Sequence, residues 1–369
     1  MKFCCTYFQT IKTMKAGQKL IIILLFLKSS LGFTQEEINY QILSVAFYNL
    51  ENLYDYVDDP LIFDEDRTPE GKDHWTQEIY RDKLKNMAYA ISRIGIDQAQ
   101  QPPVLLGLCE LENLRVLEDL VKEPVLSKQQ YGIIHYDSPD RRGIDVGLLY
   151  QPRYFVPKHS VSHELVLHDR EDPERQIYTR DQLVVSGSLE GEEIHLIVNH
   201  WPSRSGGASA SSYKREQAAL LTRNIIDSLQ AIDPYSKIII MGDFNDDPVN
   251  KSLRKLAGKD GEVPGFQKIF NPMKELYSKG IGSLAYRDSW NLFDQILLTA
   301  PFMEKKYDTY QFFKAHVFND KFLVTPEGQY QGYPFRSFGF SGYTGGYSDH
   351  FPVYVFLIKE KTKTAKEKK

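Results

Sequence analysis

The stretch Lys237-Ile-Ile-Ile-Met-Gly-Asp-Phe-Asn-Asp246 decides the fold of this chain. Its apolar run is short and rich in β-branched residues, so it predicts a buried strand and not a helix. The run stops at Gly242, and Asp243 and Asn245 follow at once. A buried strand with this ending would hold a carboxylate and an amide on a rigid base at one edge of a sheet. Taken alone, the same residues also fit an ordinary turn after a strand.

Other predicted strands carry polar groups at one end. The apolar runs lie at 42–50, 104–110, 193–199, 293–298 and 351–358, and the groups at their ends are Asn49, Glu110, His200, Asp294, and Asp349 with His350. Each group has a structural interpretation by itself, such as a turn cap or an ion pair. Together, however, several buried carboxylates repel one another unless a cation or protons lie between them. Oxygen ligands without a Cys cluster predict Mg²⁺ or Mn²⁺, with Ca²⁺ as a further option and zinc disfavoured.

The remaining pattern predicts a layered α/β domain over 41–358. A helix opens at Thr76, a second begins at about Asn113, and a long one follows a Ser/Gly-rich stretch, 203–212, that predicts a flexible loop. Further strands fit 133–137, 144–150, 161–167 and 177–188, whereas 259–290 reads mostly as loop. Because strands and helices alternate irregularly, we expect mixed sheets and not a doubly wound parallel sheet.

The two ends of the chain differ from this domain. Five Lys and the apolar run Leu20–Leu27 fall within residues 1–34, which predicts a cleaved signal peptide, export to the periplasm or beyond, and no membrane span afterwards. An uncleaved anchor is the alternative. Residues 359–369 hold six Lys, two Glu and no apolar face, so a disordered tail is expected.

Charge and cysteine content exclude two classes of protein. The formal net charge is −4, and loss of the five leader Lys would bring it to −9, which argues against a globally basic nucleic-acid binder. After the leader, Cys109 is the one remaining cysteine, so an internal disulfide is excluded.

Six motifs in order resemble the endonuclease/exonuclease/phosphatase superfamily. They are Phe47-Tyr-Asn49, Leu108-Cys-Glu110, Asn199-His200-Trp201, Gly242-Asp243-Phe-Asn245, Phe293-Asp294-Gln-Ile-Leu and Ser348-Asp349-His350, and the match spans about 41–358. The segments Asn49–Asp55 and Gly346–His350 look most like the secreted or periplasmic bacterial branch. The resemblance implies a four-layer α/β sandwich, with two mixed sheets packed face to face and helices on both outer faces. It also implies divalent-metal-dependent cleavage of a phosphoester.

The resemblance also implies a role for each residue. Glu110 would be the chief metal ligand, aided by Asn49 and Asp349. Asp243 would orient or deprotonate the attacking water, and Asn245 would hold the phosphate and the nucleophile. His200 and His350 would donate hydrogen bonds to the phosphate oxygens, with Asp294 orienting His350.

Substrate contacts are less specified by the sequence. Asp145 is the candidate carboxylate to orient His200, Arg142 and Arg204 are candidate phosphate contacts, and Trp290 is an aromatic that would stack a base. No apolar hairpin for membrane insertion and no lysine-rich pocket is evident. We therefore expect an exported nuclease acting on DNA or RNA, monomeric and without a stable protein partner. The alternatives are a sphingomyelinase-like or inositol-phosphate enzyme on the same fold and a non-catalytic binder.

Overall fold

The computed structural model describes residues 39–257 and 265–361, and the predicted signal peptide lies outside them. Two six-stranded sheets form its centre. In order across the first sheet, the strands are β15 (Gln311–Val317), β18 (Val353–Glu360), β1 (Tyr40–Leu53), β2 (Leu105–Leu111), β4 (Asp145–Tyr150) and β3 (Gly132–His135). Across the second they are β11 (Ile269–Phe270), β14 (Asp294–Thr299), β10 (Ile238–Asp243), β9 (Glu192–His200), β8 (Gln182–Leu189) and β5 (Phe155–His163).

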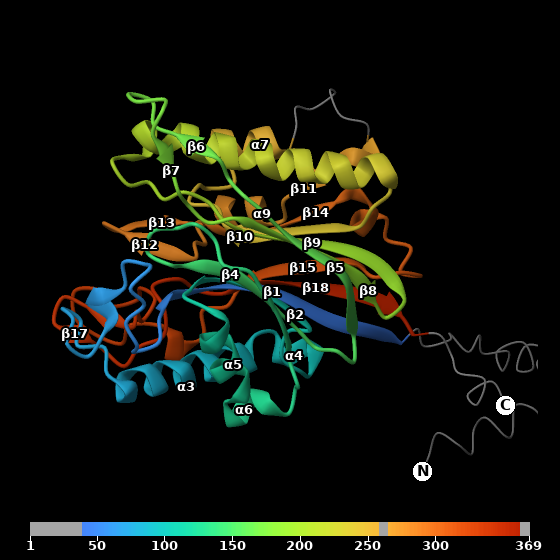
Figure 1. Cartoon of the computed structure of the whole chain (residues 1–369). Coiled ribbons are helices and arrows are strands. Elements are labelled where there is room, and N and C mark those ends of the chain that lie inside the picture. The colour runs from blue at the N-terminus through green and yellow to red at the C-terminus, as the bar shows by residue number, and fades with distance from the viewer. Residues whose placement is uncertain (1–38, 258–264, 362–369) are drawn as a thin grey trace, which may run out of the picture. The chain divides into compact units, whose positions relative to one another are not determined.

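Helices cover the outer face of each sheet, which gives the predicted four layers (Figure 1). On the first sheet lie α3 (Gln77–Arg93), α4 (Ile96–Ala99), α5 (Leu114–Lys122) and α6 (Pro124–Ser127). On the second lie α7 (Ala208–Ile232) and α8 (Lys251–Ala257), whereas α9 (Met273–Ser278) packs Met273 into the core between the sheets. Short hairpins are β6 (Leu167–His168) with β7 (Gln176–Ile177), β12 (Leu284–Tyr286) with β13 (Ser289–Asn291), and β16 (Phe338–Gly339) with β17 (Gly342–Tyr343). Single 3₁₀ turns occur at Glu65–Arg67, Gly265–Gln267, Ala300–Met303 and Lys321–Leu323.

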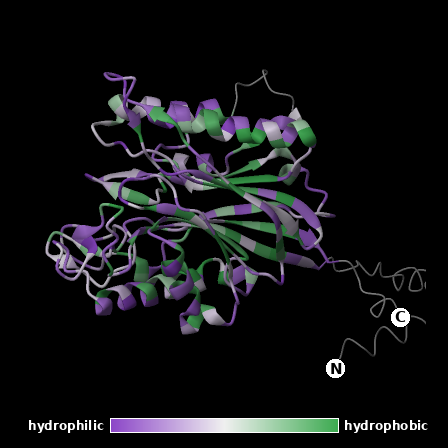
Figure 2. Cartoon of the chain, viewed as in Figure 1, coloured by the Kyte–Doolittle hydropathy of each residue, from purple (hydrophilic) through white to green (hydrophobic). Residues whose placement is uncertain are grey.

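Burial on both faces explains the uninterrupted apolar run of β10. Ile239 and Met241 point into the core between the sheets, whereas Ile238 and Ile240 pack under α7. Because alternate side chains of a strand point to opposite faces, a strand covered on both sides needs apolar residues at every position. The green centre and purple outer surfaces in Figure 2 show the same distribution over the whole fold.

Several predicted boundaries are wrong. Helix α7 begins at Ala208, inside the predicted 203–212 loop, and β5 and β8 begin and end away from 161–167 and 177–188. The 259–290 segment contains α9 and the β12–β13 hairpin in its described part. Lys359 and Glu360 continue β18, where Lys359 pairs with Glu192 at 2.8 Å, so the predicted tail starts too early. Residues 362–369 lie outside the described chain.

Within the described ranges, none of the helices has the length and apolar character needed to cross a bilayer.

Candidate active site

Strand direction brings the predicted residues to one edge of the sandwich. In each sheet the central pair is parallel, β1 with β2 and β9 with β10, so these four strands carry Asn49, Glu110, His200 and Asp243 at or near their carboxyl ends. Strands β14 and β18 run antiparallel to β10 and β1. Their first residues therefore lie at the same edge, with Asp294 directly opposite Asp243 in the register.

Asp243 is the point at which the two sheets meet. Its Oδ2 accepts a hydrogen bond from Asn49 Nδ2 at 3.2 Å, and its Oδ1 accepts one from the backbone N–H of Asn245 at 2.9 Å. Burial, aided by the Asp294 carboxylate, raises the pKa of Asp243 to about 7. A carboxylate with a pKa near neutrality is suited to accept a proton from water.

His350 is held by a buried carboxylate. Its Nδ1 lies 2.6 Å from Asp294 Oδ2, which also accepts a hydrogen bond from Ser283 Oγ at 2.5 Å. Burial alone would lower the pKa of His350, but the charge of Asp294 outweighs it and raises that pKa well above its ordinary value. The imidazole is therefore protonated at neutral pH, with Nε2–H free to donate.

His200 has the opposite charge state. Burial, together with the nearby Arg180 guanidinium, lowers the pKa of His200 well below its ordinary value, so the ring is neutral. Its Nε2 lies 3.7 Å from Glu110 Oε1 and 3.8 Å from Asp243 Oδ2. In the described part of the chain, nothing hydrogen-bonds to Nδ1.

The predicted pairing of Asp145 with His200 is wrong. Asp145 opens β4 and binds His135 Nε2 of the neighbouring strand β3 at 2.9 Å, and it also accepts from the Ser138 backbone N–H. The sequence around Asp145 cannot show whether His135 or His200 faces its carboxylate, because each sheet contributes a histidine near this edge. Arg180 instead fixes the segment after His200, since its Nη2 donates to the Trp201 carbonyl at 2.8 Å.

Arg142 and Trp290, two of the predicted substrate contacts, both interact with other residues of the protein. Arg142 is half-exposed and pairs with Asp140 at 3.3 Å, and Asp140 also binds Arg180 at 3.1 Å. Trp290 is partly exposed on β13 and stacks on Phe351, with ring centroids 6.0 Å apart.

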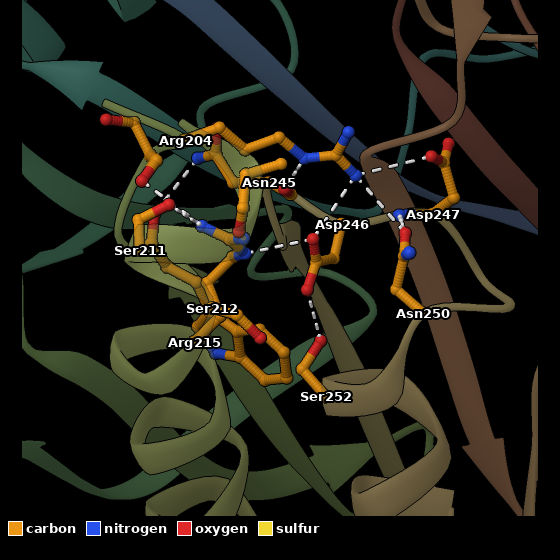
Figure 3. A network of polar contacts seen from close by, with 12 residues as sticks. Arg204, Ser211, Ser212, Arg215, Asn245, Asp246, Asp247, Asn250 and Ser252 are labelled. Atoms are coloured by element: carbon orange, nitrogen blue, oxygen red, sulfur yellow. Dashed lines mark hydrogen bonds and ion pairs between the residues drawn. The ribbon is translucent and has the colours of Figure 1, made fainter. Parts of the chain in front are cut away.

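Arg204 donates hydrogen bonds to the loop that follows β10 (Figure 3). It donates to the Asn245 carbonyl at 2.9 Å and to Asp246, Asp247 and Asn250 at 3.2 to 3.3 Å. Arg215 approaches the same Asp246 carboxylate at 2.9 Å. These arginines therefore fix the loop that carries Asn245, and a phosphate contact by Arg204 stays a prediction.

One buried network at the site was not predicted. Lys83 of α3 donates to the Glu51 carbonyl at 2.7 Å and to Ser337 Oγ at 2.5 Å. The Glu51 carboxylate binds Ser337 and Arg336, and Arg336 pairs with Asp349 at 3.1 Å. Lys83 follows Tyr80 by three residues and precedes Met87 by four, so helical spacing places it on the buried face. From that spacing the burial of Lys83 could have been predicted.

The oxygen donors at this edge fit a hard divalent cation. Glu110 has a left-handed backbone with φ of 57°, at an irregularity in the β2–β4 pairing. Its Oε2 accepts the Asn52 N–H at 3.0 Å, which orients the carboxylate, and its Oε1 lies 3.7 Å from His200 Nε2. Asp243 and Asp294 also lie opposite each other in the β10–β14 register. Such crowding of buried carboxylates is favourable only with compensating positive charge.

This fold and this edge define a metal-dependent hydrolase of phosphoester bonds. The model of the Endonuclease/Exonuclease/phosphatase family matches residues 44–359, and the chain belongs to that family. Among curated proteins, none is significantly similar to the chain.

Several solved structures share this fold but have low sequence identity to the chain. A family member from Bacteroides thetaiotaomicron is 17% identical with a TM-score of 0.53, covering 88% of this chain and 97% of its own. A mannosyl-6-phosphatase from the same organism is 18% identical with a TM-score of 0.52, covering 85% and 99%. D. rerio TDP2 complexed with single strand DNA product is 14% identical with a TM-score of 0.51, covering 86% and 98%. At these identities the likeness concerns the fold alone.

Proposed function

We propose that the protein is an exported, Mg²⁺- or Mn²⁺-dependent nuclease that hydrolyses phosphodiester bonds of DNA or RNA. The observation that carries the proposal is the position of the catalytic edge, which adjoins a wide cleft lined by aromatic and arginine side chains. These groups match the bases and phosphates of a nucleic acid. The DNA-bound TDP2 structure with the same fold supports the proposal.

The residues of the edge divide the chemistry of in-line hydrolysis. Asp243 takes a proton from the attacking water, so that the water oxygen forms a bond to phosphorus while the opposite P–O bond breaks. Protonated His350 and neutral His200 each donate a hydrogen bond to the phosphate oxygens, whose negative charge grows in the transition state.

A metal ion would complete this arrangement. Glu110, Asn49 and Asp349 would hold the ion. When bound, it would neutralise phosphate charge and stabilise the leaving oxygen. Arg336, which pairs with Asp349 at 3.1 Å, sets the orientation of that ligand.

The test is cleavage by purified residues 35–369. We expect nicking of plasmid DNA or cleavage of RNA with Mg²⁺ or Mn²⁺, and complete loss of activity with EDTA. Hydrolysis of bis-p-nitrophenyl phosphate without cleavage of any nucleic acid would support a phosphoesterase activity but overturn the proposed nuclease activity.

A phosphatase acting on sugar or inositol phosphates is the second candidate. The mannosyl-6-phosphatase with the same fold favours it. Release of inorganic phosphate from mannose 6-phosphate or inositol phosphates, in the same assay panel, would select this candidate over the nuclease.

A further inference from the structure

A cleft of about 1340 Å³ lies beside the catalytic edge. Asp349, Arg204 and Phe293 line its catalytic end. The hairpin β12–β13 and the segment 325–344 supply most of the remaining lining. This volume exceeds the ~300–1,000 Å³ typical of pockets for a single small molecule. The cleft therefore has room for more than one unit of a polymeric substrate.

Three exposed aromatic rings line this cleft. Tyr286 is 63% exposed, Tyr330 is 57% exposed and Phe340 is fully exposed. Large aromatic side chains left in water are unfavourable, and a cluster of them marks a surface that binds something. Tyr286 comes from the hairpin, whereas Tyr330 and Phe340 come from the later segment, so two separate parts of the chain contribute rings.

Hydrogen bonds join the two parts of the chain that carry these rings. Tyr333 donates a hydrogen bond to Asp288 Oδ1 at 2.6 Å and accepts one from the Asp288 backbone N–H at 2.8 Å. These bonds tie the tip of the hairpin to the 325–344 segment. Trp290, on the other hairpin strand, packs with its ring 13° from parallel to Phe351. Because the hairpin and the 325–344 segment are joined in this way, their backbones lose little conformational entropy on binding.

Positive charge accompanies the rings. The Arg287 guanidinium lies 5.2 Å from the centre of the Tyr286 ring. Arg204 and Arg336 also line the cleft, where they are paired with Asp246 and Asp349 respectively. Asp288 and Asp349 are the acids of the lining, and both are engaged, with Tyr333 and Arg336 respectively. Aromatic faces with adjacent guanidinium groups suit bases joined by phosphates.

We infer that this cleft binds unpaired bases of a single-stranded nucleic acid, next to the phosphate that is cleaved. Tyr286 and Tyr330 stack on the bases, and Arg287 contacts the backbone. In a duplex the bases stack on each other and their faces are unavailable, so the cleft selects single strands. The inference rests on the proposed nuclease function and names its substrate class.

The experiment compares three substrates for four proteins. The proteins are the wild type, Tyr286→Ala, Tyr330→Ala and, as a control, Phe313→Ala, a half-exposed aromatic on edge strand β15 outside the cleft lining. The substrates are a single-stranded oligonucleotide, its duplex and bis-p-nitrophenyl phosphate. For each protein, kcat/KM on the oligonucleotide is divided by kcat/KM on the small ester, which removes any general loss of activity.

We expect the wild type to prefer the single strand over the duplex. Each tyrosine variant should lower the ratio roughly 10-fold, as loss of one stacked base predicts. An unchanged ratio in both variants, or a preference for the duplex, would overturn the inference while leaving the nuclease intact. A wild type that hydrolyses only the small ester would overturn the nuclease itself, and the inference with it.

A binding measurement gives an independent readout. An oligonucleotide containing 2-aminopurine should lose fluorescence when its base stacks on Tyr286 or Tyr330, measured in a His350→Ala background so that the strand stays intact. Quenching that is equal in the presence and absence of both tyrosines would contradict the stacking role.

Discussion

The two site histidines differ in charge because their neighbours differ. His350 faces the buried carboxylate of Asp294 at 2.6 Å, whereas His200 is buried near the Arg180 guanidinium. In the proposed mechanism, a cationic donor and a neutral donor would therefore face the same phosphate. This pairing supplies positive charge on one side without placing two cations together in a buried site.

His350→Ala should lower kcat at least about 100-fold, because a charged hydrogen-bond donor to the transition state is lost. Steady-state kinetics on bis-p-nitrophenyl phosphate would measure it. His159→Ala, a change of an exposed histidine on β5, serves as the control and should leave kcat unchanged. A folded His350→Ala protein with wild-type kcat would contradict the assigned role.

Lys83→Met should destabilise the fold by about 3 kcal/mol, because it leaves the buried Glu51 carboxylate near fewer positive charges. Urea unfolding would measure the change. The double variant Lys83→Met/Glu51→Gln should recover part of the loss, since the neutral amide needs no cation. Equal stability of the single and double variants would mean that Lys83 acts through packing alone.

At this scale the sequence predicts which residues gather but not which pairs form. Asn49, Asp243 and His350 could be assigned to the site because each lies at the end of an apolar run. The partner of Asp145 depends on the register of β3 and β4, and the left-handed turn at Glu110 depends on an irregular pairing of β2. Neither feature has a local sequence signal.

Among the secondary-structure elements, α7 and α8 are joined by a cluster of opposite charges. Glu216 of α7 accepts hydrogen bonds from Lys251 and Lys255 of α8, at 3.0 and 2.5 Å. Burial opposes the ionised form, but the two ammonium groups outweigh it and lower the pKa of Glu216 to about 2. A carboxylate with a depressed pKa stabilises the fold above its unfolded pKa and loses that effect as pH falls towards 2.

Glu216→Gln should therefore lower the free energy of unfolding by about 1 kcal/mol at pH 7. The effect is small because both lysines are more than half exposed, so solvent screens their charges. The difference from the wild type should shrink between pH 4.5 and pH 2. Urea midpoints at pH 7, 4.5 and 3.5 would follow it, with Glu118→Gln on α5 as the control. A difference that grows as the pH falls would refute the assignment.

Strands buried on both faces could be predicted from the sequence, whereas of the edge strands β3 was expected at 133–137 and β15 was not expected. Strands β2 and β10 are almost continuous apolar runs, and β1 and β9 contain such runs at 45–48 and 196–198. Strand β15 lies at a sheet edge and carries the exposed Phe313 and Lys314, so its sequence has no clear strand pattern. The first turn of α7 is fixed by Arg215, which donates to the Ala208 carbonyl at 3.0 Å. Such a tertiary contact overrides the loop-forming composition before it.

At the scale of the whole molecule, the two sheets have the same sequence of strand directions. From β15 to β3 and from β11 to β5, the neighbours pair antiparallel, antiparallel, parallel, antiparallel and antiparallel. In the packed sheets, the carboxyl ends of both parallel pairs meet, as the hydrogen bond from Asn49 of β1 to Asp243 of β10 shows. The topology therefore gathers the carboxylates at this end of the sandwich. Repulsion between them lowers the stability of the whole domain.

A bound cation should relieve that repulsion and stabilise the whole domain. At Mg²⁺ or Mn²⁺ concentrations about 100 times Kd, binding adds about 2.7 kcal/mol, enough to raise Tm by several degrees. Differential scanning calorimetry with and without the metal would detect the rise, and EDTA should reverse it. Glu110→Gln should remove most of the shift, because the oriented carboxylate oxygen is lost, whereas Glu118→Gln should retain it. An equal shift in both variants would mean that the ion binds elsewhere and that the carboxylates at this edge are balanced by protons.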